Sequence, residues 1–95
     1  MSRGGRFIIV PGRIVARETE VADVFEVING GWEAEICGDE LVVAATGQKV
    51  ADGASVVFVD GDEAEELALL VGGAPHSKVA EVATEYVRKK GERQR

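Results

Sequence analysis

Residues 32–43 read WEAEICGDELVV, and this stretch decides the fold prediction. Apolar and acidic side chains alternate through its first half, which is typical of a strand with one buried face. Gly38 and Asp39 then form a tight turn, and a second apolar run begins at Leu41. Two strand-like runs joined by a short, glycine-containing turn predict a β-hairpin.

The chain before this hairpin begins with a second pair of strand-like runs. Phe7–Val10 is rich in β-branched residues, and Pro11–Gly12 interrupts it before Arg13–Ala16 resumes the pattern. Such runs, bounded by a proline–glycine pair, predict a strand, a turn or bulge, and another strand.

The segment Val21–Ile28 fits two structures. Val21, Val24, Phe25 and Ile28 recur at the spacing of one helix face, but half of the segment is β-branched, which favours a strand. We interpret it as a short helix and keep the strand as the alternative.

The second half of the chain predicts one more strand and two helices. Lys49–Gly53 is interpreted as a connecting turn, and Ser55–Val59 as a central strand because both of its faces are apolar. A helix follows over Glu63–Val71, with Asp62 as its N-cap. Ser77–Lys90 carries an apolar stripe at helical spacing and predicts the last helix.

Together these elements predict an α+β fold, with a small mixed β-sheet of four to five strands and two to three helices packed on one side. A chain of 95 residues suits a single domain spanning residues 1–95. Residues 1–6 and 91–95 are expected to be flexible tails.

Charge is distributed unevenly along the chain, whose formal net charge is −6. Residues 18–66 carry fourteen acidic side chains and a single base, Lys49, whereas both ends are basic. An acidic centre repels phosphate backbones, so nucleic acid is an unlikely partner. No apolar run is long enough for membrane insertion, and a lone cysteine allows no internal disulfide. We therefore expect a cytoplasmic protein.

Motifs that suggest chemistry have simpler explanations. The acidic run Asp60–Glu63 lacks the ligand spacing of a calcium loop and suits a helix N-terminus. Cys37 has no neighbouring base in the sequence and is expected to be buried. We expect no enzymatic activity, no cofactor and no metal site.

Four residues are candidates for binding. Arg13 and Arg17 are cations of the basic N-terminal region, and His76 precedes a helix where free backbone N–H groups could hold an anion. These three are ligand-binding candidates. Trp32, beside a glycine pair, is a candidate interface residue or a core anchor.

The run Gly38–Val43, then Gln48–Gly53, then Ser55–Asp62 and an acidic helix resembles the C-terminal regulatory domain of potassium-conductance regulators, the TrkA C-terminal or RCK C-terminal domain. The resemblance covers about residues 8–71. It assigns the family's first helix and the following strand to Val21–Ile36. The family's usual Pro-Gly-Asp turn is absent.

This resemblance implies a dimeric, non-enzymatic regulatory module that senses a small ligand or nucleotide and acts on a larger protein partner. The exposed sheet edges of so small a protein also favour a homodimer. The alternative is a small β-barrel adaptor subunit of a nucleic-acid or protein assembly. A helix over Val21–Ile28 supports the regulatory module, and a strand there supports the barrel.

Overall fold

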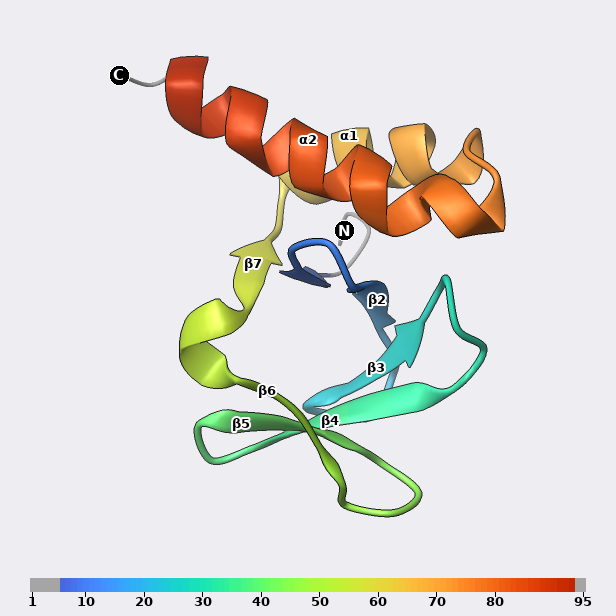
Figure 1. Ribbon diagram of the computed structural model, residues 1–95, viewed down its shortest axis with the longest axis vertical. Helices are drawn as coiled ribbons and strands as arrows, with labels where there is room; N and C mark the ends of the chain where they lie inside the picture. The colour runs from blue at the N-terminus through green and yellow to red at the C-terminus, as the bar shows by residue number, and fades with distance from the viewer. Residues whose placement is uncertain (1–5, 94–95) are drawn as a thin grey trace.

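The computed structural model describes residues 6–93 and consists of a curled antiparallel sheet with two helices against its outer face (Figure 1). Residues 1–5 and 94–95, which belong to the expected flexible tails, lie outside the residues that the structure describes. The strands are β1 (Phe7–Val10), β2 (Ile14–Glu18), β3 (Val24–Val27), β4 (Glu33–Cys37), β5 (Glu40–Val43), β6 (Lys49–Asp52) and β7 (Val57–Val59). The helices are α1 (Asp62–Gly72) and α2 (Val79–Arg93), with short 3-10 turns at Gly53–Ser55 and His76–Lys78.

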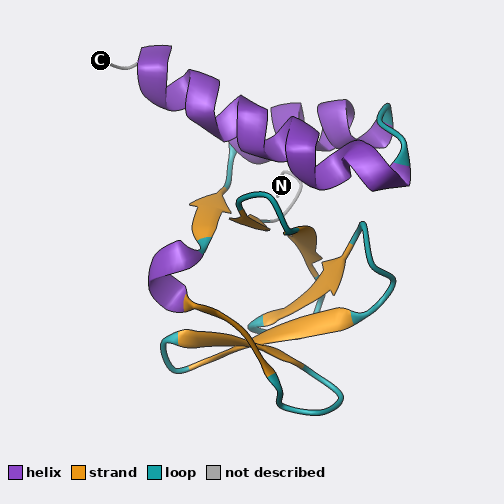
Figure 2. Ribbon diagram, in the orientation of Figure 1, coloured by secondary structure: helices purple, strands orange, loops and turns teal. Residues whose placement is uncertain are grey.

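The strands lie in the order β6-β5-β4-β3-β2-β1-β7, and every neighbouring pair is antiparallel. The first six strands form a meander, and the chain then returns to place β7 beside β1. The sheet curls into a half-barrel whose two edge strands, β6 and β7, are joined through the turn at Gly53–Ser55 (Figure 2). The protein is α+β.

The predicted sheet was wrong in strand number and in direction. It has seven strands where four to five were expected, and it is antiparallel where a mixed sheet was expected. The connections explain the direction, because turns of a few residues can join only antiparallel neighbours. Two segments interpreted as a helix and a turn are strands β3 and β6, which explains the count.

The short helix predicted over Val21–Ile28 was wrong, because Val24–Val27 is strand β3. Phe25 and Val27 are buried inside the half-barrel while Glu26 between them is exposed, which is the two-residue period of a strand. Pairing on both sides fixes this conformation, since β3 joins β2 and β4. Asp23 has a positive φ of 64° and turns the chain into the strand. Its backbone carbonyl oxygen accepts a hydrogen bond from the Ile36 N–H (2.9 Å).

The strand predicted to be central lies at the edge of the sheet. Strand β7 pairs only with β1 and has three residues. Strand β1 is buried on both faces over its whole length, because Ile8 and Val10 point into the half-barrel while Phe7 and Ile9 face the helices. The first three residues of β2 are buried in the same alternating way. Residues 49–53, interpreted as a connecting turn, provide strand β6 instead.

The protein has two apolar cores that share β1. One fills the half-barrel and includes Phe25 and Leu41. The other lies between the sheet and the helices, where Leu67 of α1 and Val79 of α2 are fully or almost fully buried. Burying one such side chain contributes about 1.5–3 kcal/mol. Each helix therefore packs against the sheet on one face, and its other face points away from the sheet.

The ends of the helices differ slightly from the sequence prediction. Gly61, at φ 66° and ψ −135°, is the N-cap of α1, and Asp62 is the first helical residue and makes no capping hydrogen bond. Acidic residues in the first turn still favour the helix, because they interact with its dipole. Helix α1 ends at Gly72, one residue beyond the predicted Val71. Helix α2 spans Val79–Arg93 where Ser77–Lys90 was predicted, because His76–Lys78 forms a 3-10 turn.

Polar contacts tie the sheet together at its ends. The Arg6 Nη2 and Nε atoms donate to Glu18 Oε2 (2.9 and 3.2 Å), and the Arg6 backbone N–H donates to Glu18 Oε1 (3.1 Å). The Arg6 guanidinium also lies over the rings of Phe25 and Phe58 (5.6 and 5.7 Å to the centroids). At the other end, the Gly12 N–H donates to Thr84 Oγ1 of α2 (2.9 Å).

Candidate functional site

The most unusual surface of the molecule is the outward side of α1. Ala64, Leu67 and Val71 form its buried face, whereas Leu69 is 78% exposed and Leu70 is 45% exposed. Leu70 lines a groove between α1 and α2, whereas Leu69 lines a separate depression with Asp62 and Glu65. Single exposed leucines are common on protein surfaces, but two adjacent ones mark α1 as a candidate interaction surface. The sequence prediction missed both residues.

The groove between α1 and α2 has a volume of about 820 Å³. Figure 1 shows the two helices side by side on the same outer face of the half-barrel, and they are in direct contact. The apolar part of the groove is lined by Leu70, Ala74, Pro75, Val82 and Tyr86. Charged side chains border this apolar part, namely those of Glu66, Lys78, Glu81, Glu85 and Lys89. The groove is thus a depression with an apolar part and a charged border, between two helices that the sheet holds from the other side.

The two helices are joined by polar contacts along the groove. The Tyr86 hydroxyl donates to Glu66 Oε1 (2.8 Å), and Lys90 Nζ lies 3.5 Å from Glu63 Oε2. These contacts join α1 to α2, and buried residues of both helices pack on the sheet, so the groove between them is part of the folded structure. Preorganisation of this kind lowers the entropic cost of binding.

The charge on this surface is uneven. Helix α1 carries Asp62, Glu63, Glu65 and Glu66 and no basic residue. Asp62 and Glu65 are exposed and make no ion pair within residues 6–93. The α1 side of the surface is therefore acidic.

Several charges of α2 pair with residues nearby in the chain. Lys78 Nζ lies 3.6 Å from Glu81 Oε1. Arg88 pairs with Glu85, and this contact lowers the pKa of the Glu85 carboxyl.

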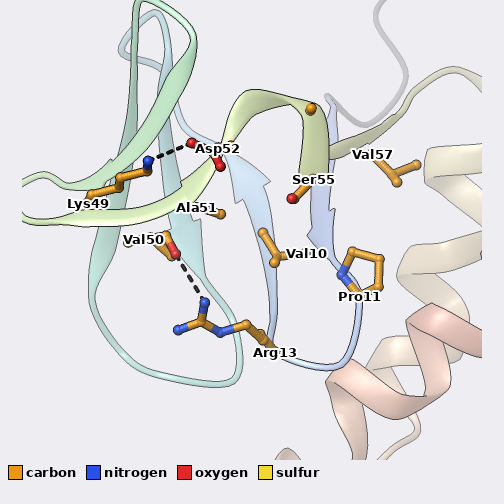
Figure 3. Close-up of a pocket in the computed structure, with 10 residues that line it drawn as sticks. Val10, Pro11, Arg13, Lys49, Val50, Ala51, Asp52, Ser55 and Val57 are labelled. Carbon is orange, nitrogen blue, oxygen red and sulfur yellow. Dashed lines mark hydrogen bonds and ion pairs between the residues drawn. The ribbon is translucent and has the colours of Figure 1, made fainter.

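A second pocket lies at the seam of the half-barrel, between β6 and the β1–β2 turn, and has a volume of about 740 Å³ (Figure 3). Arg13 lies beside it, and its Nη1 donates to the carbonyl oxygen of Val50 (3.1 Å). Within residues 6–93 its other N–H groups make no hydrogen bond and could bind a carboxylate or phosphate. Lys49, also in this pocket, pairs with Asp52 and lies 3.7 Å from Glu40, and the Asp52 contact raises the pKa of the lysine.

The other two ligand-binding candidates lie together, away from Arg13. Arg17 and His76 line a pocket of about 240 Å³ with Phe7, Ile28 and Val79, where strand β2 approaches the start of α2. The structure therefore distributes the three candidates over two pockets. Both Arg17 and His76 are exposed, and neither pocket includes Leu69.

Trp32 is half-buried and packs against the core inside the half-barrel. A Cβ atom added at Gly30 would lie 2.4 Å from its Nε1, so the glycine gives the indole its space. The accessible part of Trp32 lines a shallow pocket of about 330 Å³ with Val43, Ala44 and Ala45. Trp32 thus has features of both the core anchor and the interface residue.

Other groups considered in the sequence do not form a reactive site in the described part of the chain. No group of three or more His, Cys, Asp or Glu residues within it could hold a metal ion. Cys37, expected to be buried, is exposed at the end of β4. Neither helix of residues 6–93 combines the length and apolar character needed to cross a membrane.

Comparison with protein-family models, curated proteins and solved structures found no match for this chain. The resemblance to the C-terminal domains of potassium-conductance regulators thus stays a prediction. The helix that it assigned from Val21 onward is β3 in the structure.

Proposed function

We propose that this protein is a non-enzymatic adaptor of the cytoplasm, which binds a protein partner through the outward surface of α1 and α2. The observation that carries the proposal is the exposure of two adjacent leucines on α1, of which Leu70 lines the groove between the helices and Leu69 lines the depression beside it. Covering these two side chains would contribute roughly 2–4 kcal/mol to a complex. An exposed Cys37 is also compatible with a compartment that keeps thiols reduced.

The rest of the fold supports this proposal. The half-barrel has its own core, and the helices are fixed to its outer face through a second core. This arrangement presents a rigid helical surface without using its outward side for stability. A strand over the segment Val21–Ile28 was the feature that favoured the barrel-like adaptor, and β3 occupies residues 24–27.

The test is a paired substitution, Leu69→Gln with Leu70→Gln, which removes the apolar side chains but keeps good helix formers. The matched control is Val21→Gln, which changes a side chain that is 62% exposed on the β2–β3 connection. The wild type and control should capture the same partner from cells that express the chain, and the double variant should lose it.

The captured partner is then purified and titrated into each variant by calorimetry. We expect one-to-one binding that the double substitution weakens at least tenfold, equivalent to about 1.4 kcal/mol. Equal affinity of the double variant and wild type, or the absence of any partner that binds after purification, would refute the proposal.

A second candidate function is the dimeric ligand-sensing module, and the seam pocket favours it. That pocket lies beside edge strand β6 and contains Arg13, whose guanidinium has N–H groups left for an anion. A thermal-shift panel of nucleotides and carboxylates tests it. A ligand that stabilises the wild type but not Arg13→Gln would support the sensor, provided that sedimentation also shows a dimer.

A further inference from the structure

We infer that the partner segment is a basic amphipathic helix of three to four turns, which packs its apolar face on Leu69 and Leu70. This inference rests on the proposed function and adds the chemistry of the partner. Its Lys or Arg side chains would lie along the acidic side of α1, opposite Asp62 and Glu65.

The acidic side of the surface favours a basic partner. A depression beside α1 is lined by Asp62, Glu65, Glu66 and Leu69, so the acidic side chains and the exposed leucine border the same space. Charges arranged in this way attract a segment of opposite charge and fix its orientation.

The same charges disfavour a second copy of this chain as the occupant. A two-fold symmetric contact through α1 would place the acidic first turns of both α1 helices at one interface, and α1 has no basic residue to offset them. A contact between α1 and the α2 of another copy would meet Arg88 and Lys90, which already pair with Glu85 and Glu63, and Lys89 of the groove lining. A segment with several Lys or Arg side chains on a different molecule therefore supplies more positive charge to α1 than a second copy does.

The dimensions of the surface favour a helix. Helix α1 has 11 residues and is about 16 Å long, which matches a partner helix of three turns or slightly more. The groove between two packed helices accepts the ridge of a third, because side-chain rows interlock. An extended peptide would instead need a free strand edge, and the edges β6 and β7 belong to the sheet rather than to this helical surface.

The probe is a fluorescent, 15-residue helix-forming peptide with leucines at positions i, i+3, i+4 and i+7 and lysines beside them. A second peptide of the same leucine pattern carries glutamates in place of the lysines. We expect the basic peptide to bind the wild-type protein at least tenfold more tightly than the acidic peptide, as measured by fluorescence anisotropy. Its affinity should fall as NaCl is raised, because exposed charges are screened.

Two variants separate docking from general attraction to an acidic protein. Leu69→Gln with Leu70→Gln leaves the net charge unchanged and should weaken binding of the basic peptide at least tenfold. Asp62→Asn with Glu65→Gln should weaken it about three- to tenfold. Circular dichroism should show that both variants remain folded.

The control for the charge change is Glu20→Gln with Asp39→Asn, which removes two exposed acidic side chains outside α1 and should change the affinity less than twofold. The inference is wrong if the control weakens binding as much as the α1 substitutions do, if the leucine variant binds as well as wild type, or if both peptides bind equally. Sedimentation showing a leucine-dependent dimer would also overturn it.

The failure of this inference can be distinguished from failure of the adaptor function. If the purified cellular partner binds through Leu69 and Leu70 but uses a neutral or acidic segment, the adaptor proposal stands and the basic helix is wrong. If no purified partner depends on these leucines, the adaptor proposal itself is wrong.

Discussion

Substituting Glu18 by Gln tests whether the Arg6–Glu18 contact holds the end of the half-barrel together. The carboxylate accepts three hydrogen bonds from Arg6 and is only about a quarter exposed (26%). Glutamine has one carbonyl oxygen, which can accept either from the Arg6 backbone N–H or from the two guanidinium donors that converge on Oε2. Its amide nitrogen cannot accept at the other position. Exposed ion pairs contribute about 0–1 kcal/mol, and charge-assisted bonds with partial burial contribute more. We expect a loss of about 1–2 kcal/mol.

The dependence on pH identifies the cause of this loss. Hydrogen bonds from Arg6 lower the pKa of Glu18 in the folded protein. A lowered pKa means that the contact stabilises the fold fully above about pH 5 and less as pH falls through the folded-state pKa. The difference in unfolding free energy between wild type and variant should therefore be constant near neutral pH and disappear in acid.

Urea unfolding monitored by circular dichroism at several pH values measures this difference in unfolding free energy. In a separate thermal unfolding experiment at neutral pH, the melting temperature should fall by about 4–8 °C for each kcal/mol lost. Glu20→Gln is the matched control, because Glu20 is exposed and the substitution removes the same charge. A difference that persists unchanged down to pH 3 would show that altered packing, rather than the ion pair, destabilises the variant.

Three further substitutions test the packing of the fold by urea unfolding. Gly53→Ala should cost more than about 1 kcal/mol, because the new Cβ would lie 2.6 Å from the Asp39 carbonyl oxygen, and an unchanged midpoint would contradict this close approach. Leu67→Ala should cost about 2–5 kcal/mol, since the side chain is fully buried between helix and sheet; a loss under 1 kcal/mol would mean that this layer is loosely packed. Glu33→Lys should stabilise the protein by about 0.5–1 kcal/mol at low salt, because Glu33 lies directly opposite Glu26, and failure to gain stability would argue against this register.

Local sequence patterns predicted the elements that have strong boundaries. The alternation from Trp32 to Cys37 and the following Gly38 identified the β4–β5 hairpin, because both its strands and its turn are encoded within a few residues. The β1–β2 strand pair was identified for the same reason.

The position of a strand in the sheet depends on partners far along the chain, and this part of the fold was not predicted. Val24 and Phe25 fit a helical spacing, but pairing with β2 and β4 makes them part of a strand. Strand β7 is highly apolar yet lies at the edge, because Val59 packs against the helices instead of lying between two strands. The local sequence around each strand does not determine those long-range contacts.

The candidate docking surface could have been predicted in part. Once α1 is expected, Ala64, Leu67 and Val71 define its buried face, and Leu69 falls outside that face. The groove beside it could not be predicted, because its shape depends on how α1 and α2 pack against each other.

The burial of β1 on both faces has a consequence for protein synthesis. The ribosome makes β1 before its neighbour β7 and before the helices that cover Phe7 and Ile9. About 70 residues separate β1 from Ala83 of α2. At a translation rate of about 5–20 residues per second, Phe7 and Ile9 therefore stay partly exposed for roughly 4–15 s before all the residues that bury them have been synthesised. During that interval the nascent chain presents an apolar strand edge and face, which is the form of the protein that a chaperone would recognise.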